Sequence, residues 1–272
     1  MNDKLEHLER AVAGLGRALV AYSGGVDSHF LLSVCVDQLG PANVLAVTVD
    51  SPLLPHAELV AAGELAAALG APHLVVRRDE LADPGIANNP SDRCYHCKRG
   101  RFLALREIAA ERDFPHLLHG ENADDADDYR PGVRAACELG VVAPLADAGL
   151  TKAEIRALSR ARGLPTWDRP AQACLASRFP YGTPLTAEGL ARVEAAERAL
   201  VEQLGPVQAR VRDHWPIARL EVAPADIARL AAPDLREPVV ARLRELGYLY
   251  VTVDLAGYRT GSLNDAIDLL SL

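Results

Sequence analysis

Short apolar runs alternate with longer amphipathic segments over the first two thirds of the chain. The apolar runs at 17–22, 43–50, 72–79, 116–120 and 141–145 predict β-strands. Segments with helical periodicity lie between or after them, at 28–40, 56–70, 93–113 and 150–163. This alternation predicts the α/β class, with a parallel sheet covered by helices on both faces. Ligands of such sheets bind beyond the carboxyl ends of the strands.

The pattern changes at SRFPYGTPLTAEG, where two prolines and two glycines fall within a few residues. We place a domain boundary there, which gives domains 1–183 and 184–272. The second domain reads as a helix at 187–203, strands at 207–213 and 217–222, a helix at 224–246 broken near Pro233, and a strand at 248–254. This order predicts a small α+β domain with an antiparallel sheet, which we expect to serve substrate binding or oligomerisation.

Composition restricts the possible partners. The chain has 272 residues, 49% of them hydrophobic, and a net charge of −8, so it can bury a large core but is poorly suited to following a nucleic-acid backbone. No charge-free apolar run is long enough to span a bilayer, and the charged N-terminal segment does not look like a signal peptide. We therefore expect a cytoplasmic protein, with neither a membrane nor a nucleic acid as partner.

The stretch AYSGGVDSHFLL, residues 21–32, places a glycine pair between a predicted strand and a predicted helix. Gly24 and Gly25 let phosphate oxygens approach the backbone, and the N–H groups at the helix start supply positive potential. Ser23 and Ser28 add hydroxyl donors. The stretch lacks the lysine of a Walker loop and the third glycine of a dinucleotide fingerprint. The simpler alternative is a glycine turn followed by a helix cap.

SGGVDS is similar to the PP-loop of the N-type ATP pyrophosphatases, which cut ATP to AMP and pyrophosphate and adenylate an oxygen of their substrate. The resemblance implies that the loop grips the pyrophosphate and that Asp27 helps to hold Mg²⁺. GENADD, residues 120–125, resembles the second acidic loop of that superfamily, although such carboxylates are often only solvated surface. The implied ATP-binding residues are Ser23, Gly24, Gly25, Val26, Asp27, Ser28, Val47, Thr48, Val49, Gly120 and Lys152, the three residues at 47–49 bordering the adenosine.

The five cysteines fall into two groups. Cys35 and Cys137 lie in apolar surroundings and are expected to be small buried side chains. Cys94 and Cys97 are one helical turn apart, and Cys174 precedes the domain boundary among polar residues. Three thiolates suit an iron–sulfur cluster with one open iron, whereas structural zinc normally takes four ligands. A redox pair or simple surface thiols at 94 and 97 are the alternatives.

Several segments together resemble the LarE family of ATP-dependent sulfur transferases, which build the nickel-pincer nucleotide cofactor. They are NNPSDRCYHCK, GENADDADDYRPG, DRPAQACLASRFPYG, RVRDHWPIARLE and DLAGYRTGSLN. The resemblance implies that the carboxylates of pyridinium-3,5-biscarboxylic acid mononucleotide are adenylated and converted to thiocarboxylates. Members with a single cysteine at the position of Cys174 sacrifice it, and members with the extra pair bind a [4Fe-4S] cluster. It therefore implies a cluster on Cys94, Cys97 and Cys174, with Cys174 and Asp27 as catalytic residues and sulfide or another sulfur source as co-substrate.

Basic residues of the C-terminal part suit a phosphorylated substrate. Arg210 and Arg212 are two apart in a predicted strand, so both guanidinium groups point to one face. Arg178 follows Cys174 by four residues and could join them, and Glu221 could orient an arginine or meet the pyridinium charge. The alternative is an ordinary charged outer face.

Three other functions fit parts of the pattern: a tRNA-thiolating PP-loop enzyme, a non-catalytic nucleotide-binding module with structural zinc, and an amide-forming ligase. The acidic balance and the lack of zinc-ribbon cysteine pairs disfavour the first. An amide-forming ligase leaves Cys174 without a role. We also expect a homo-oligomer.

Overall fold

The computed structural model of the protein describes residues 1–127, 131–170, 173–205, 208–259 and 262–263. Its chain forms two compact units, one of residues 1–79 and 92–172 and one of residues 80–91 and 173–272. The predicted boundary between residues 183 and 184 falls inside the second unit, and as a division into domains it stays a prediction. Three quoted segments include residues outside the described ones, at 128–130, 171–172, 260–261 and 264.

The first unit contains a four-stranded parallel sheet. Its strands are β1 (Ala18–Ala21), β2 (Val44–Asp50), β3 (His73–Arg77) and β4 (His116–His119), in the order β3-β2-β1-β4. This confirms the predicted parallel sheet. The strand predicted at 141–145 is wrong: Val142 makes only an isolated bridge to Leu118, and helix α7 (Pro144–Asp147) begins at once. Proline cannot donate to a strand ladder but suits the first position of a helix.

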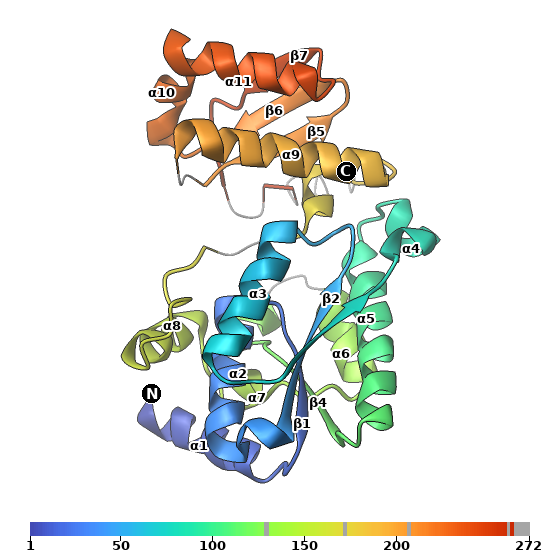
Figure 1. The fold of residues 1–272 in the computed structure, drawn as a ribbon, viewed down its shortest axis with the longest axis vertical. Coiled ribbons are helices and arrows are strands. Elements are labelled where there is room, and N and C mark those ends of the chain that lie inside the picture. The colour runs from blue at the N-terminus through green and yellow to red at the C-terminus, as the bar shows by residue number, and fades with distance from the viewer. Residues whose placement is uncertain (128–130, 171–172, 206–207, 260–261, 264–272) are drawn as a thin grey trace. The chain divides into compact units, whose positions relative to one another are not determined.

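Helices cover both faces of this sheet (Figure 1). Strand side chains alternate, so that Ala18 and Val20 join one apolar core while Leu19 joins the other. The first core is closed by α1 (Asn2–Ala13), α2 (Val26–Leu39), α3 (His56–Ala68) and α8 (Lys152–Ala161). The second is closed by α5 (Arg93–Glu111) and α6 (Pro131–Glu138). The α/β layer arrangement expected from the sequence is confirmed.

The second unit packs three helices against a three-stranded sheet. The helices are α9 (Ala187–Leu204), α10 (Ile227–Ala231) and α11 (Pro233–Glu245), and the strands are β5 (Arg210–His214), β6 (Ile217–Glu221) and β7 (Tyr250–Val253). The break near Pro233 is confirmed. The prediction of a wholly antiparallel sheet is wrong, because β5 and β6 are antiparallel whereas β6 and β7 are parallel. The chain returns through α10 and α11 before β7, and such a crossover lets two neighbouring strands run the same way.

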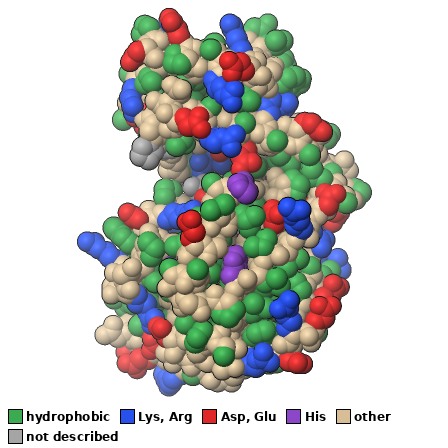
Figure 2. Space-filling view, in the orientation of Figure 1, with side chains coloured by type: hydrophobic (Ala, Val, Ile, Leu, Met, Phe, Trp, Pro, Cys, Tyr) green, Lys and Arg blue, Asp and Glu red, His purple; other side chains and the backbone are tan. Residues whose placement is uncertain are grey.

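Short helical turns complete the structure. They are α4 (Pro84–Ala87) and the 3₁₀ turns η1 (Pro41–Asn43), η2 (Glu80–Ala82), η3 (Ala123–Asp127), η4 (Leu175–Arg178) and η5 (Pro224–Asp226). Within the described residues, every helix is too short or too polar to cross a membrane. On the face that Figure 2 shows, acidic and basic side chains are intermixed. The location of the protein in the cell stays a prediction.

Cysteine burial is partly as expected. Cys35 is buried in α2, but Cys137 is exposed, so its predicted burial is wrong. Ala135 and Ala136 occupy the buried face of α6. Successive residues of a helix turn by about 100°, and this rotation brings Cys137 out to solvent.

Candidate functional site

The segment Ser23–Ser28, here called the PP-loop, follows β1 and includes the first three residues of α2. The Tyr22 N–H still donates to the Val47 carbonyl at 2.9 Å, so the loop leaves directly from the sheet. The Ser23 and Ser28 hydroxyl oxygens lie 3.1 Å apart, and the Gly25 N–H approaches the Ser23 Oγ at 3.4 Å. Gly25 is the N-cap of α2 and has no side-chain cap. Backbone N–H groups and two hydroxyls thus gather at the positive end of a helix, which is an anion-binding arrangement.

Two glycines allow this loop to pack closely. Gly24 has φ +71°, and a Cβ there would lie 3.1 Å from the Ala62 Cα of α3. Gly120, just after β4, would place a Cβ 2.8 Å from the Ser28 backbone nitrogen. A side chain at either position would meet backbone atoms, which cannot swing away. The predicted site residue Gly120 therefore lies directly against the start of α2.

Asp27, in the helical part of the PP-loop, is the centre of a polar cluster. Its Oδ2 accepts a hydrogen bond from Lys152 Nζ at 2.6 Å and from Asn122 Nδ2 at 3.4 Å. Its other oxygen, Oδ1, is buried and has no hydrogen-bond partner among the described residues. Burial raises the pKa of Asp27, and the neighbouring Lys152 ammonium opposes that rise. The structure thus brings together the predicted residues Asp27, Gly120 and Lys152.

The loop after β4 supplies side chains that the sequence did not single out. Asp125 Oδ2 accepts from the Asn122 N–H at 3.1 Å, and Asn122 Oδ1 accepts from the Asp124 N–H at 3.0 Å. Asp124 in turn accepts from the Lys152 N–H at 2.8 Å, which ties this loop to the start of α8. GENADD marked this loop as acidic, but only the tertiary fold shows that Asn122 reaches Asp27.

The predicted adenosine residues have buried side chains. Val47 and Val49 are part of the core beneath α5. Thr48 Oγ1 donates to the Tyr22 carbonyl at 2.9 Å and lies 2.8 Å from His73 Nε2. If these residues border adenosine, they do so mainly through their backbone at the carboxyl end of β2, and that role stays a prediction.

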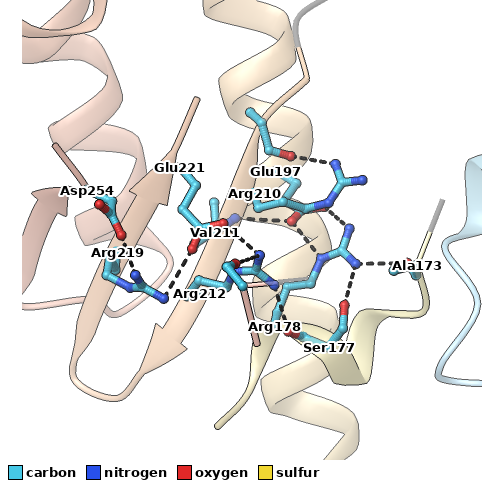
Figure 3. A network of polar contacts seen from close by, with 12 residues as sticks. Ala173, Ser177, Arg178, Glu197, Arg210, Val211, Arg212, Arg219, Glu221 and Asp254 are labelled. Atoms are coloured by element: carbon cyan, nitrogen blue, oxygen red, sulfur yellow. Dashed lines mark hydrogen bonds and ion pairs between the residues drawn. The ribbon is translucent and has the colours of Figure 1, made fainter. Parts of the chain in front are cut away.

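In the second unit, several hydrogen bonds fix the side chain of Arg178 (Figure 3). Its side chain is 1% exposed and forms a two-pronged pair with Glu197 of α9, at 2.8 and 2.9 Å. Its Nη1 donates to the Ala173 and Cys174 carbonyls at 2.8 and 3.1 Å. The Cys174 carbonyl also accepts from the Ser177 hydroxyl at 2.8 Å. Arg178 therefore holds the two peptide groups that flank the Cys174 Cα atom.

Arg210 and Arg212 lie on one face of β5, as their spacing predicted, while Val211 between them is part of the core. Arg212 donates to Glu221 Oε2 at 2.6 Å and to the Ser177 carbonyl at 2.8 Å (Figure 3). The Arg210 guanidinium lies 5.3 Å from the centre of the Tyr258 ring. Burial, with a contribution from the Arg178 cation, lowers the pKa of Arg210. The structure thus gathers the predicted residues Arg178, Arg210, Arg212 and Glu221, together with the backbone of Cys174.

The pair Cys94 and Cys97 lies in the first turn of α5, with Cys94 exposed and Cys97 partly buried. Cys174, also partly buried, is the N-cap of η4. The first two belong to one unit and Cys174 to the other. Among the described residues no group of three or more His, Cys, Asp or Glu side chains is arranged to hold a metal ion. The three-cysteine ligand set therefore stays a prediction.

The donor chemistry of these residues can be compared with each implied metal. The buried Oδ1 of Asp27 is a hard oxygen donor that has no hydrogen bond from any described residue, and such a donor type suits Mg²⁺. Thiols three residues apart near the start of a helix lie on neighbouring positions of one side, and thiolates are the donor type that suits iron. Binding of either group stays a prediction.

Comparison with known proteins gives relatives over nearly the whole chain, although no family model matches it. An uncharacterized protein of Synechocystis is 43% identical, over 97% of this chain and 98% of the relative. The pyridinium-3,5-bisthiocarboxylic acid mononucleotide synthase of Lactiplantibacillus plantarum is 40% identical, over 96% of this chain and 93% of the relative.

A more distant similarity covers about half of the chain. The argininosuccinate synthase of Natronomonas pharaonis is 31% identical over 55% of this chain, which covers 40% of that enzyme. This partial match agrees with a PP-loop fold. The near full-length match to the Lactiplantibacillus synthase decides the assignment: the chain belongs to the LarE family of pyridinium-3,5-bisthiocarboxylic acid mononucleotide synthases.

Proposed function

We propose that the protein is an ATP-dependent sulfur transferase that converts the carboxylates of pyridinium-3,5-biscarboxylic acid mononucleotide to thiocarboxylates, releasing AMP and pyrophosphate. The observation that carries the proposal is the 40% identity to the synthase over 96% of the chain. The PP-loop and its polar cluster would bind the ATP.

Cleavage of ATP would activate the carboxylate of the substrate. A carboxylate is a poor electrophile because its charge is delocalised and oxide is a poor leaving group. Attack of a carboxylate oxygen on the α-phosphorus releases pyrophosphate and forms an acyl adenylate. A sulfur nucleophile can then displace AMP and leave a thiocarboxylate. The N–H groups and hydroxyls of the PP-loop would hold the β and γ phosphates, where negative charge collects as pyrophosphate leaves.

Asp27 and Lys152 would both help to neutralise the negative charge that collects on the departing pyrophosphate. Asp27 Oδ1 would help to hold Mg²⁺, and bound Mg²⁺ would neutralise charge on the departing pyrophosphate. Lys152, 2.6 Å from Asp27 Oδ2, would donate to a phosphate oxygen as well. The loop at Asn122–Asp125 keeps both side chains in position.

The buried arginines of the second unit would bind the phosphate of the mononucleotide. Arg210 and Arg212 share a face of β5, and burial together with repulsion from the Arg178 cation lowers the pKa of Arg210. A phosphate dianion would relieve that repulsion. Arg178 is engaged with Glu197 and with carbonyls, so its role would be to hold the Cys174 backbone.

Cys94, Cys97 and Cys174 would hold a [4Fe-4S] cluster as sulfur carrier. When bound, the cluster would supply an open iron that carries the transferable sulfide. The chain's own contribution is the thiol pair of α5 and the fixed backbone at Cys174. Sulfide or another sulfur source would be the co-substrate, and a cytoplasmic homo-oligomer remains part of the proposal.

Anaerobic turnover tests the function directly. Purified protein is given ATP, Mg²⁺, sulfide and pyridinium-3,5-biscarboxylic acid mononucleotide, and pyrophosphate and product mass are measured. We expect pyrophosphate release that depends on the mononucleotide and a gain of about 16 mass units per converted carboxylate, the difference between sulfur and oxygen. Asp27→Ala should abolish both signals in a folded protein. Pyrophosphate release that needs no mononucleotide, or that survives in Asp27→Ala, would contradict the proposal.

A further inference from the structure

Arg169, in the segment after α8, reaches the PP-loop. Its Nη1 donates to the Gly24 carbonyl oxygen at 3.2 Å, and its Nη2 donates to Glu58 Oε1 of α3 at 2.9 Å. The side chain is 24% exposed and that of Glu58 13%. One guanidinium group thus joins the loop to the helix that packs against Gly24.

The backbone of Arg169 is itself fixed. Its N–H donates to the Thr166 carbonyl at 3.1 Å. The Trp167 and Arg169 carbonyls accept the two arms of Arg156, a residue of α8, at 2.7 and 2.8 Å. The planar fork of Arg169 therefore starts from an anchored position, which reduces the entropy lost on each hydrogen bond.

The bond to the Gly24 carbonyl controls the next N–H group. In a planar trans peptide the carbonyl oxygen and the following N–H point in opposite directions. Because Arg169 holds the Gly24 oxygen, the Gly25 N–H points away from Arg169, to the side where the Ser23 hydroxyl lies at 3.4 Å. Gly24, at φ +71°, is the residue around which this peptide could otherwise rotate.

Arg169 also brings its positive charge to the loop, because its guanidinium contacts the Gly24 carbonyl oxygen at 3.2 Å. A positive charge next to the loop favours any anion bound there.

From these contacts we infer that Arg169 is a positioning residue for the PP-loop. It holds the peptide between Gly24 and Gly25 so that the Gly25 N–H faces the pyrophosphate part of ATP, and it adds positive charge beside it. The inference rests on the proposed function, since it concerns the same ATP site.

The test compares Arg169→Gln and Arg169→Lys with a matched control, Arg160→Gln. Arg160 is an exposed residue of α8 whose guanidinium lies 4.8 Å from the centre of the Trp167 ring, in the same part of the fold. For each variant we measure thermal unfolding, binding of a non-hydrolysable ATP analogue by calorimetry, and KM for ATP and for the mononucleotide.

We expect Arg169→Gln to weaken analogue binding and raise KM for ATP about 10- to 100-fold, the range expected for lost hydrogen bonds of a charged group. Arg169→Lys keeps the charge but cannot reach both acceptors, so its effect should be smaller. KM for the mononucleotide should change less than about threefold, and Arg160→Gln should resemble the unchanged protein.

Two results would overturn the inference. One is analogue binding in both folded Arg169 variants equal to that of Arg160→Gln. The other is an equal rise of both KM values that follows a fall in the melting temperature, which would indicate a merely structural role. Asp27→Ala distinguishes a wrong inference about Arg169 from a wrong proposed function. If only the inference about Arg169 is wrong, Asp27→Ala still abolishes pyrophosphate release. If the proposed function is wrong, pyrophosphate release survives in Asp27→Ala.

Discussion

At the scale of single residues, Asp27 shows a conflict between stability and function. Its carboxylate is buried, one oxygen has no hydrogen-bond partner among the described residues, and burial raises its pKa above the ordinary value of 3.8. A folded-state pKa above the unfolded value means that the folded protein binds the proton more tightly. The free energy of unfolding therefore falls as pH rises from below 4 through the raised pKa. An ionised Asp27 would serve the proposed metal and phosphate chemistry, and it does not favour folding.

Asp27→Asn should accordingly separate the two properties. We expect pyrophosphate release to fall at least about 100-fold, while the free energy of unfolding at pH 7 stays equal or increases. Any gain in stability should shrink as pH is lowered through the raised pKa, because wild-type Asp27 is then increasingly protonated. Urea unfolding across this pH range measures it, with exposed Asp147→Asn as control. A large loss of stability at pH 7 that persists at pH 4 would show that the carboxylate is needed for folding.

At the scale of elements, the site depends on how closely β4 approaches α2. A Cβ at Gly120 would lie 2.8 Å from the Ser28 nitrogen, so Gly120→Ala must move the start of α2 or the end of β4. We expect it to lower the free energy of unfolding by about 1–3 kcal/mol, as overpacking does, and to weaken ATP binding.

Gly63→Ala is the matched control for that change. Gly63 lies within α3, and its added Cβ would make only ordinary contacts with the His73 ring, at 3.8 Å to Nδ1 and 4.0 Å to Cε1. Replacing a helical glycine by alanine should stabilise the protein by about 0.5–1 kcal/mol. Equal unfolding free energies for the two variants would contradict the close-approach argument for Gly120.

The two arginines on one face of strand β5 are the proposed ligands of the substrate phosphate. The double variant Arg210→Ala, Arg212→Ala removes both guanidinium groups from one face of the strand while leaving Val211 in the core. We expect KM for the mononucleotide to rise at least about 100-fold and KM for ATP less than about threefold, each lost charged contact costing about 1.5–3 kcal/mol. Steady-state kinetics with each substrate varied in turn measures the difference. Equal shifts in both KM values would assign these arginines to structure alone.

Periodicity in the sequence was sufficient for most elements but not for their long-range contacts. The four strands of the first sheet all lie inside their predicted ranges, since buried parallel strands are nearly continuous apolar runs. The strand predicted at 141–145 is wrong because Pro144 cannot donate a strand hydrogen bond and instead begins helix α7, although the residues around it are apolar. The parallel pairing of β7 depends on where a crossover returns, which local pattern does not encode.

The site was predictable where a motif is local. SGGVDS identified the PP-loop, and the spacing of Arg210 and Arg212 placed them on one face. Arg169 and Glu58 are 111 residues apart in sequence, and neither stands out among the charged residues of its segment. Their contact with the PP-loop follows only from the packing of α3 and the segment after α8 around it.

At the scale of the whole molecule, the proposed cysteine ligands predict how sulfur is supplied. If Cys94, Cys97 and Cys174 hold a cluster, anaerobic protein should contain iron and acid-labile sulfide and absorb broadly in the visible range. Serine at any one of the three should remove iron and activity together, because two thiolates hold a cluster poorly. Cys137→Ser is the matched control, since Cys137 is an exposed thiol outside the set and should leave the iron content unchanged.

The alternative is that Cys174 is consumed. Sulfur transfer from its thiolate to the acyl adenylate, followed by loss of the Cα proton and cleavage of the Cβ–S bond, would leave dehydroalanine. Each chain would then supply one sulfur, and its mass would fall by about 34, the mass of H₂S. Cys94→Ser and Cys97→Ser would keep single-turnover activity while Cys174→Ser lost it. We expect instead repeated turnover with sulfide and an unchanged chain mass. If Cys174 were consumed, the thiol pair of α5 would have no function in sulfur transfer. Dehydroalanine at position 174 in a protein still active without Cys94 and Cys97 would reverse this assignment.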